Sequence, residues 1–326
     1  MTRPLPPVRV VAIGGGTGLS TLLRGLKEFP AEITAIVAVT DDGGSSGRLR
    51  SELGIPAVGD IRNCLVALAE AEPIMSELFQ HRFRRGSLAG HSFGNLLIAA
   101  LHEILGDFGA AVRESSRILA VRGTVLPSTE EDVVLCGELE DGRQVRGEHE
   151  VTREGPRLRR LWIEPASRPP REAVEAVLSA DLVALGPGSL FTSILPNLLV
   201  PELAEAVRSS GAWRVLVVNV MTQPGETDGF DAVDHLRAVR QTAGDVVDAV
   251  LVNSGRPDPA ALERYRAQGA ELVGYDLRAL AAEGVRPRVA DVIQRGDWIR
   301  HDPWKLGGWL VREAARARRR RPSREA

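Results

Sequence analysis

Unbroken apolar runs alternate with amphipathic segments near the start of the chain. The runs "VRVVAI" (8–13) and "ITAIVAV" (33–39) are rich in Val and Ile, and "LSTLLRGLKEF" (19–29) between them places apolar residues at helical spacing. Apolar runs without polar alternation are typical of strands that are buried on both faces of a parallel sheet. The pattern therefore predicts a strand, a helix and a second strand in a βαβ unit.

Two later stretches depart from this rhythm. Helical periodicity predicts helices near 60–71, 73–83, 91–105 and 109–120, with Asp60 as an N-cap and Gly90 and Gly106 as breaks. We expect a helical insertion of about residues 60–120 there. From about 122 to 164 polar alternation around an Asp-Gly turn at 141–142, followed by "RLRRLWIEP", predicts a small antiparallel β excursion.

Strands followed by polar or glycine-bearing loops return in the second half. They are "ADLVALGPGS" (180–189), "WRVLVVNVMTQPGE" (213–226) and "VDAVLVNSG" (247–255), with a final strand and a helix capped by Asp302 with Pro303 at its first position. The fold class that we predict is α/β, a Rossmann-like doubly wound and mostly parallel sheet. We expect a single domain over 1–326 that ends in a basic tail at about 316–326.

Composition limits the choice of partners and location. The chain has 326 residues, of which 44% are hydrophobic and 26% charged, and 41 Lys+Arg against 43 Asp+Glu leave a net charge of -2. This balance gives no case for nucleic acid or an acidic membrane as the main partner, and we interpret the basic tail as solvated. Cys64 and Cys136 lack a CxxC partner or clustered histidines, and no apolar run approaches the roughly 18 residues of a membrane span. We expect a cytoplasmic protein without a disulfide framework or zinc site.

Two glycine loops follow predicted strands, where open α/β sheets collect their ligands. Gly14, Gly15, Gly16, Thr17 and Gly18 form a sharp turn into a helix N-terminus, and Gly186, Pro187, Gly188, Ser189 and Thr192 form a second such turn. Free N–H groups at such turns suit phosphate. The first loop is not a dinucleotide fingerprint, because Leu19 occupies the place of the third glycine, and no Gly-Lys pair marks a P-loop. Together the loops predict a site for a diphosphate or for two anionic ligands.

Between these loops the chain carries an acidic loop, "TDDGGSSGRLR". Asp41 and Asp42 repel phosphate unless a metal or a sugar hydroxyl lies between, whereas Ser45, Ser46 and Arg48 could contact a distal phosphate or sugar. We expect this loop to form the acidic wall of a shared cleft.

Three further polar clusters complete the candidate site. They comprise Asp60, Arg62 and Asn63 in "VGDIRNCL", His91, Ser92 and Asn95 in "GHSFGNLL", and Asn219, Thr222, Gln223, Glu226 and Thr227 in "NVMTQPGETDGF". Helix capping is an equal alternative for the first two clusters. A ligand-facing loop is favoured for the third, because buried polar groups cost stability unless they are hydrogen-bonded.

The motifs "IGGGTGLS", "DDGGSSGRLR", "GDIRN", "HSFGNLL", "LGPGSLFTSILPNLLVP", "NVMTQPGET" and "IRHD" occur in this order. In this the chain resembles the YvcK-type gluconeogenesis-factor group of bacteria, within the superfamily of the 2-phospho-L-lactate transferase CofD, over roughly residues 8–315. The resemblance implies a Rossmann-like core that binds a nucleotide diphosphate. YvcK-type members are associated with UDP-sugars and with cell shape and envelope growth on gluconeogenic carbon sources, whereas CofD transfers a phospholactyl group from a guanosine diphosphate donor to a deazaflavin hydroxyl, using Mg2+.

Residue roles follow from this resemblance. The segment Gly14–Gly18 would form the nucleotide phosphate loop, Asp41 and Asp42 would face the acceptor or a metal, and Gly186–Ser189 would lie across the cleft. Asn95 is assigned to the nucleotide site, and Asp60, Arg62, Asn63, His91 and Ser92 are expected beside it or on the acceptor side. Tyr265 and Arg300 are candidates for base or sugar contacts, since Tyr stacks on rings and Arg pairs with phosphate, although structural roles are equally open.

Three functions follow as hypotheses. The first is a UDP-sugar-binding regulator of envelope synthesis, for example a binder of UDP-N-acetylglucosamine, acting as a homodimer with a regulatory protein partner. The second is a Mg2+-dependent CofD-type transferase in which Asp41 or Asp42 holds the metal or orients an acceptor hydroxyl. The third is an NAD(P)-dependent oxidoreductase, which the missing third glycine weakens, so no redox cofactor is expected.

Overall fold

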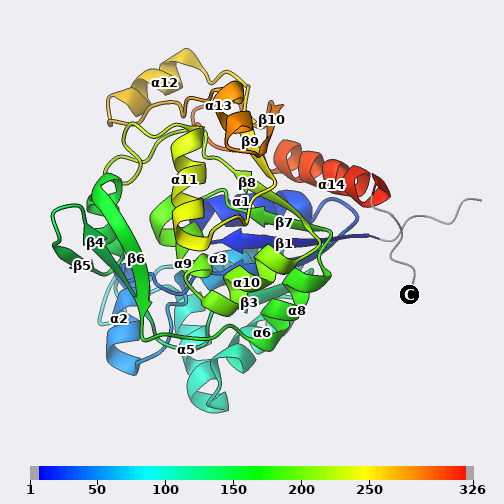
Figure 1. The fold of residues 1–326 in the computed structure, drawn as a ribbon. Coiled ribbons are helices and arrows are strands. Elements are labelled where there is room, and N and C mark those ends of the chain that lie inside the picture. Colours follow the sequence, from blue (N-terminus) through cyan, green and yellow to red (C-terminus); the bar gives the residue numbers. More distant parts are fainter. Residues whose placement is uncertain (1–6, 321–326) are drawn as a thin grey trace, which may run out of the picture.

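Seven parallel strands form the central sheet of the computed structural model, which describes residues 7–320 (Figure 1). The strands are β1 (Val8–Gly14), β2 (Ala31–Val37), β3 (Thr124–Pro127), β7 (Leu182–Leu185), β8 (Trp213–Val217), β9 (Ala249–Asn253) and β10 (Arg286–Ala290). Their order is β10-β9-β8-β7-β1-β2-β3, so the chain runs outward from β1 in one direction and from β7 in the other. The crevice of a doubly wound sheet opens at this switch point. The predicted Rossmann-like fold class is confirmed.

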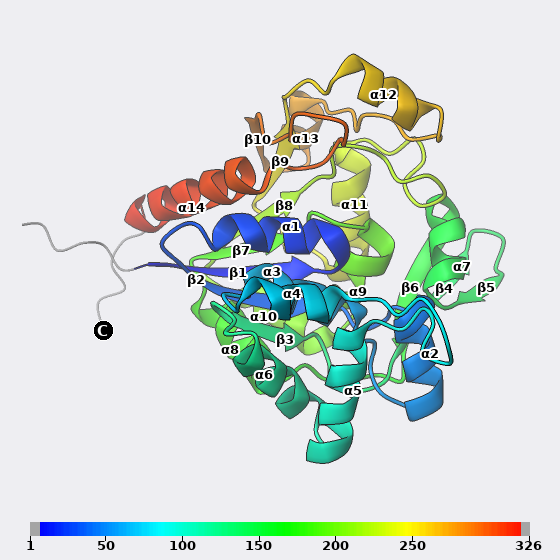
Figure 2. The ribbon, with the colours of Figure 1, turned by 180° about the vertical axis from the view of Figure 1, so that it is seen from behind.

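Helices cover both faces of the sheet. In Figure 2, α1 (Gly16–Leu26) and α14 (Pro303–Arg320) lie next to each other above β1, and α3 (Gly59–Leu68) packs beside α1. In Figure 1 the opposite face carries α8 (Arg171–Ser179), α10 (Pro201–Ser209) and α11 (Ala232–Ala243). Both faces of the strands are therefore buried, which explains their unbroken apolar runs.

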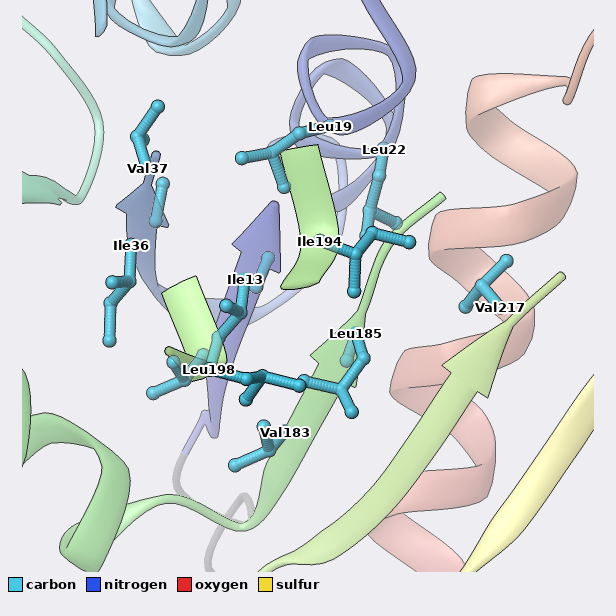
Figure 3. Close-up of a cluster of buried hydrophobic side chains, with 14 of the residues drawn as sticks. Ile13, Leu19, Leu22, Ile36, Val37, Val183, Leu185, Ile194, Leu198 and Val217 are labelled. Atoms are coloured by element: carbon cyan, nitrogen blue, oxygen red, sulfur yellow. The ribbon is translucent and has the colours of Figure 1, made fainter. Parts of the chain in front are cut away.

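The main core lies at the switch point. Side chains from β1 and β7, including Ile13 and Leu185, meet Leu22 of α1 and Ile194 (Figure 3). All four are at most 2% exposed. Ile194 ends a π-helical turn, Leu190–Ile194, which continues into α9 (Leu195–Leu198). The core thus supports the loops that leave β1 and β7.

The helical insertion matches the prediction except at its start. It contains α3, α4 (Pro73–Gln80), α5 (Phe93–Leu105) and α6 (Phe108–Ile118), but it is preceded by α2 (Gly44–Leu53), where we expected a loop. Two glycines and three serines give α2 little intrinsic helix propensity. Tertiary contacts stabilise this helix, because the buried Arg50 side chain donates hydrogen bonds to Asp132 and to the carbonyl groups of Thr40 and Val133. The interpretation of Asp60 as an N-cap was wrong, since α3 begins at Gly59 with Val58 as its N-cap.

The predicted β excursion also forms. It consists of β4 (Val134–Leu139), β5 (Gln144–Arg146) and β6 (Leu158–Glu164), an antiparallel sheet in the order β5-β4-β6, with the Asp-Gly turn as expected. The excursion also includes α7 (Glu148–Arg153) and a short 3-10 turn, Gly155–Arg157. Residues 124–127 belong instead to the main sheet, where β3 pairs parallel with β2. Four residues are too few for periodicity to assign them to a sheet.

The C-terminal part has α12 (Pro259–Arg266), α13 (Leu277–Ala282) and α14. Asp302 caps α14 as predicted, accepting from the Lys305 amide at 2.9 Å. The helix continues to Arg320, so the expected tail is helical over 316–320, and 321–326 lie outside the described residues. Within residues 7–320 no single helix is long and apolar enough to cross a membrane, and only the pair Leu190–Leu198 and Pro201–Ser209, bent by 80°, meets that test jointly.

Gly25 of α1 generates the first prediction. A Cβ built on Gly25 would overlap the Pro303 carbonyl group, and one on Gly307 would lie 2.6 Å from the Gly25 carbonyl carbon. Gly25→Ala should push α14 away from α1 and cost about 1–3 kcal/mol of unfolding free energy in urea titrations. Gly274→Ala is the control, because its nearest contact is 4.0 Å away. Equal stabilities for the two variants would contradict the close packing of α1 against α14.

Candidate functional site

The two glycine loops lie against each other at the switch point. The first leaves β1 and enters α1, and the second leaves the neighbouring strand β7. A Cβ on Gly18 would lie 2.7 Å from the Pro187 carbonyl carbon and 2.8 Å from the Gly188 Cα. One on Gly15 would lie 3.2 Å from Ser193 and would overlap the Asp60 carboxylate. The close approach of the two backbones therefore requires glycine at position 18, and the side chains of Asp60 and Ser193 leave no room for a Cβ at Gly15.

The N-terminus of α1 faces this junction. Its N-cap residue, Gly15, provides no side-chain cap, and the helix has 11 residues. The first amides of a helix lack intrahelical partners and carry partial positive charge, so this end suits an anion. The Gly16 amide is directed at the carboxylate of Asp60. Burial and the nearby Asp41 raise the pKa of Asp60 to about 6. The hydrogen bond from the Gly16 amide and the positive charge of Arg62 partly oppose this rise.

The second loop is held by a network of side chains behind it. Asn219 accepts from the Gly188 amide at 3.1 Å and donates to the Gly188 carbonyl at 2.8 Å. Glu226 is fully buried and accepts from the Ser189 hydroxyl and, at 2.9 Å, from the Phe191 amide. Burial raises the pKa of Glu226, and the hydrogen bonds from Ser189 and from the Phe191 amide oppose that shift. This network fixes the shape of the loop before any ligand arrives.

A cavity of about 590 Å³ extends from the glycine loops. Such a volume is in the range of small-molecule sites. Its wall includes, of the predicted residues, Gly15, Gly16, Thr17, Gly18, Pro187, Gly188, Ser189, Asn219, Thr222, Gln223, Tyr265 and Arg300. Sequence reasoning missed Ser193, Met221, Gln268, Trp298, Ile299 and His301, which also line it. The first glycine loop and Tyr265 are far apart in the sequence but line the same cavity.

Several predicted residues lie elsewhere. Glu226 and Thr227 are buried behind the second loop, where Thr227 accepts from the Gln223 amide at 2.9 Å. Gly14 contributes its carbonyl group to Asn197, which donates at 3.1 Å. Thr192 lies beside Ser189, with 2.5 Å between their hydroxyl oxygens, and does not line the cavity.

The serines of the acidic loop belong to α2 and contact residues at the start of α5. Ser45, Ser46, Arg62, His91, Ser92 and Asn95 are all at least nine-tenths buried. The Ser45 hydroxyl lies 3.2 Å from His91 Nδ1 and accepts from the Ser92 amide, and Asn95 donates to Ser46 at 3.5 Å. Arg62 donates to Asn63 at 2.8 Å, and Arg48 donates to the Ala89 carbonyl at 2.9 Å. The contacts of Ser45 and Ser46 join α2 to the start of α5, and none of these residues lines the 590 Å³ cavity.

Asp41 and Asp42 take different positions. Both oxygens of Asp42 are engaged by α7, one by the Glu148 amide at 2.8 Å and the other by His149 Nδ1 at 2.6 Å. Asp41 accepts from the Gly43 amide through Oδ1, and its Oδ2 lies near Gly59. Asp41, Glu148 and His149 line a second hollow of about 560 Å³, which shares Pro224 with the cavity. The acidic wall is therefore formed by Asp41 with α7.

The fit to Mg2+ differs for the two aspartates. Among residues 7–320 no group of three or more His, Cys, Asp or Glu side chains is arranged to hold a metal. Mg2+ in phosphoryl-transfer sites needs only one or two carboxylates together with the substrate phosphates. Asp41 retains an oxygen for that role, whereas Asp42 is committed to α7. The residues thus fit Mg2+ through Asp41 alone.

Glu148 is a site residue that sequence reasoning missed. Burial raises the pKa of Glu148 to about 8, with further contributions from the negative charges of Asp41 and Asp60. A hydrogen bond with Thr192 acts in the opposite direction and lowers the pKa. Its carboxyl group therefore holds a proton to a higher pH than an ordinary glutamate does. The segment "GEHE" looks like ordinary exposed polar sequence, and only the docking of α7 by Asp42 brings Glu148 to the acidic wall.

This raised pKa generates a prediction for Glu148→Gln. A carboxyl group whose folded pKa lies above its unfolded value loses stabilising free energy as pH rises from about 4.5 to about 8. The variant should therefore gain stability relative to wild type across this window, by at most about 1.4 kcal/mol per pH unit, in urea unfolding at several pH values. Glu150→Gln, which removes a surface ion pair with Arg153 on the same helix, should show no such growth. Parallel curves for wild type and Glu148→Gln would rule out the raised pKa of this half-buried carboxyl group.

Comparisons with known proteins identify the family of this chain. The model of the family "2-phospho-L-lactate transferase CofD" matches residues 10–293. The chain is 49% identical to the gluconeogenesis factor of Bacillus subtilis, over 93% of this chain and 97% of that protein. It is 50% identical to the gluconeogenesis factor of Halalkalibacterium halodurans, over 91% and 94%.

A solved structure gives the same result. The crystal structure of a UPF0052 family member from Bacillus halodurans superposes with a TM-score of 0.91 at 47% identity, covering 94% of this chain and all of that one. The chain therefore belongs to the CofD family, within its group of bacterial gluconeogenesis factors.

Proposed function

We propose that this protein binds a UDP-sugar such as UDP-N-acetylglucosamine and acts in the regulation of cell shape and envelope synthesis during gluconeogenic growth. The observation that carries the proposal is the junction of two glycine loops, which opens into a cavity of about 590 Å³ with Tyr265 and Arg300 in its wall. A diphosphate at the N-terminus of α1 would leave the rest of the ligand to extend along this cavity.

The dimensions of the sheet support a ligand of this length. Strands are spaced about 4.8 Å apart, so the loops of β1, β7 and β8 span about 10 Å at the sheet edge. The cavity wall follows these three loops from Gly15 to Gln223. A ribose and a diphosphate can lie across such a distance, with hydroxyl groups of the sugar near Asp41.

The regulatory part of the proposal rests on the relatives. Their printed name, gluconeogenesis factor, supports a role in gluconeogenic growth. We extend the proposal to a cytoplasmic homodimer that transmits the level of its ligand to a protein of envelope synthesis.

The proposed ligand gives a direct prediction. Isothermal titration calorimetry should detect binding of UDP-N-acetylglucosamine or UDP-glucose, and Arg300→Ala should weaken it by about 10-fold to 100-fold, because charge-assisted hydrogen bonds are worth about 1.5–3 kcal/mol. Arg295→Ala removes the same charge from a neighbouring exposed position that does not line the cavity, and should bind like wild type. Absence of heat with both ligands would end the proposal.

The alternative function is a Mg2+-dependent transferase of CofD type. The specific observation in its favour is that the Asp41 carboxylate and the raised-pKa carboxyl of Glu148 line a hollow adjoining the cavity. When bound, Mg2+ would neutralise charge on the transferring phosphate. Asp41 would then hold the metal or orient the acceptor hydroxyl, and Glu148 could hold a proton near it.

This alternative separates the two aspartates experimentally. With Mg2+ and a guanosine or uridine diphosphate donor, Asp41→Asn should abolish nucleotide release measured by phosphorus NMR while donor binding in calorimetry stays largely intact. Asp42→Asn should chiefly lower the melting temperature, because it releases α7 from the acidic loop. If wild type releases no nucleotide with any of several hydroxyl acceptors, the transferase hypothesis fails.

A further inference from the structure

Trp298 is the exposed aromatic residue of the cavity wall. Its side chain is 64% exposed, although it belongs to the lining of the 590 Å³ cavity. The neighbouring Ile299 is 6% exposed and packs in a small apolar cluster with Val220, Met221 and Tyr265. A large aromatic surface open to a cavity loses favourable burial until something covers it.

The segment that carries Trp298 is a tightly held hairpin. An antiparallel bridge joins Ile293 to His301, and the Gln294 amide donates to the Arg300 carbonyl at 2.8 Å. The Arg300 guanidinium donates to the Gln294 side chain at 2.7 Å, and Arg264 of α12 donates to the Asp297 carbonyl at 2.9 Å, next to Trp298. The ring is therefore presented from a fixed frame, which keeps the entropy cost of binding low.

His301 anchors this hairpin to the central sheet. It is 6% exposed and forms a hydrogen bond with the backbone of Val218, directly after β8. Burial lowers the pKa of His301 to about 4, although the Val218 bond opposes the shift, so the ring is neutral at physiological pH. The hairpin thus stands above β8, on the side away from β1 and β2.

The order of features along the sheet edge gives the orientation of a ligand. Asp41 follows β2, the two glycine loops follow β1 and β7, and the hairpin stands over β8. Carboxylates suit sugar hydroxyls, glycine loops suit phosphates, and aromatic faces suit bases. A nucleotide sugar has its parts in this order, with the sugar and the base on opposite sides of the diphosphate.

We propose that Trp298 is the residue on which the nucleobase stacks, and that the hairpin Ile293–His301 is the base subsite of the cavity. This inference rests on the proposed nucleotide-sugar function and names the residue that holds the base. It also explains why Trp298 is exposed while the adjacent Ile299 is buried. Stacking tolerates any base, so Trp298 supplies affinity and the groups around it supply the choice of base.

Tryptophan fluorescence tests the inference with uridine monophosphate as the probe. Wild type should be quenched on titration, and Trp298→Phe should lose most of the quenching. Because phenylalanine can still stack on a base, Trp298→Phe should bind UDP-N-acetylglucosamine more tightly in calorimetry than Trp298→Ala does. Trp298→Ala should lose affinity by about 5-fold to 100-fold, the worth of one base–aromatic stack. Trp304→Phe is the matched control, because Trp304 is 61% exposed on α14 and does not line the cavity, so quenching should persist.

The outcomes separate this inference from the function on which it rests. If wild type binds no UDP-sugar, the proposed function fails. If wild type binds but Trp298→Phe is quenched like wild type and Trp298→Ala binds equally well, the function stands and the base subsite is wrong. Quenching of Trp298 by N-acetylglucosamine 1-phosphate and not by uridine monophosphate would place the sugar on the hairpin and overturn the assignment. Melting curves of the exposed-site variants verify that each remains folded.

Discussion

The close approach of two backbones at the switch point is the constraint on which the rest of the site depends. Gly18 lies so near Pro187 and Gly188 that no side chain fits between the loops of β1 and β7. With side chains absent, the amides at the start of α1 can face a common cavity. The same contact brings Ser193 and Asp60 against Gly15. The anion-binding end of α1, the second loop and the nearest carboxyl group are therefore set by a single packing requirement.

Charge is distributed unevenly around this junction. Both carboxylate oxygens of Asp42 form hydrogen bonds with α7, and these bonds bring Glu148 close to Asp41 and Asp60. Burial disfavours the charged form of a carboxyl group, and negatively charged neighbours disfavour it further. For these two reasons the pKa values of Asp60 and Glu148 rise. One side of the junction is therefore suited to hydroxyl groups or a metal, and the α1 side is suited to phosphate.

The far side of the cavity is built differently. A small apolar cluster around Val220 and Ile299, separate from the main core, supports α12 and the hairpin that carries Trp298. Its few buried side chains give local stability, and the bond from His301 to the Val218 backbone ties it to the sheet. The glycine-rich and aromatic parts of the cavity and the acidic hollow that adjoins it are thus held by separate elements, and they lie together because their strands are neighbours in the sheet.

The sequence by itself determined the α/β class, the strands β1, β2, β7, β8, β9 and β10, the helical insertion and the antiparallel excursion, because unbroken apolar runs and helical periodicity are local signals. The sequence also located both glycine loops, because glycine occurs where the backbone turns sharply or approaches another backbone closely. The tertiary structure decided which polar residues reach the cavity. Ser45, His91 and Asn95 are buried where α2 packs against the start of α5, and Asp42 binds α7. Trp298 and His301 line the cavity, and Glu148 lies near Asp41, although the sequence had marked none of the three as candidates. A side chain's neighbours depend on strand order and helix docking, which no local spacing records.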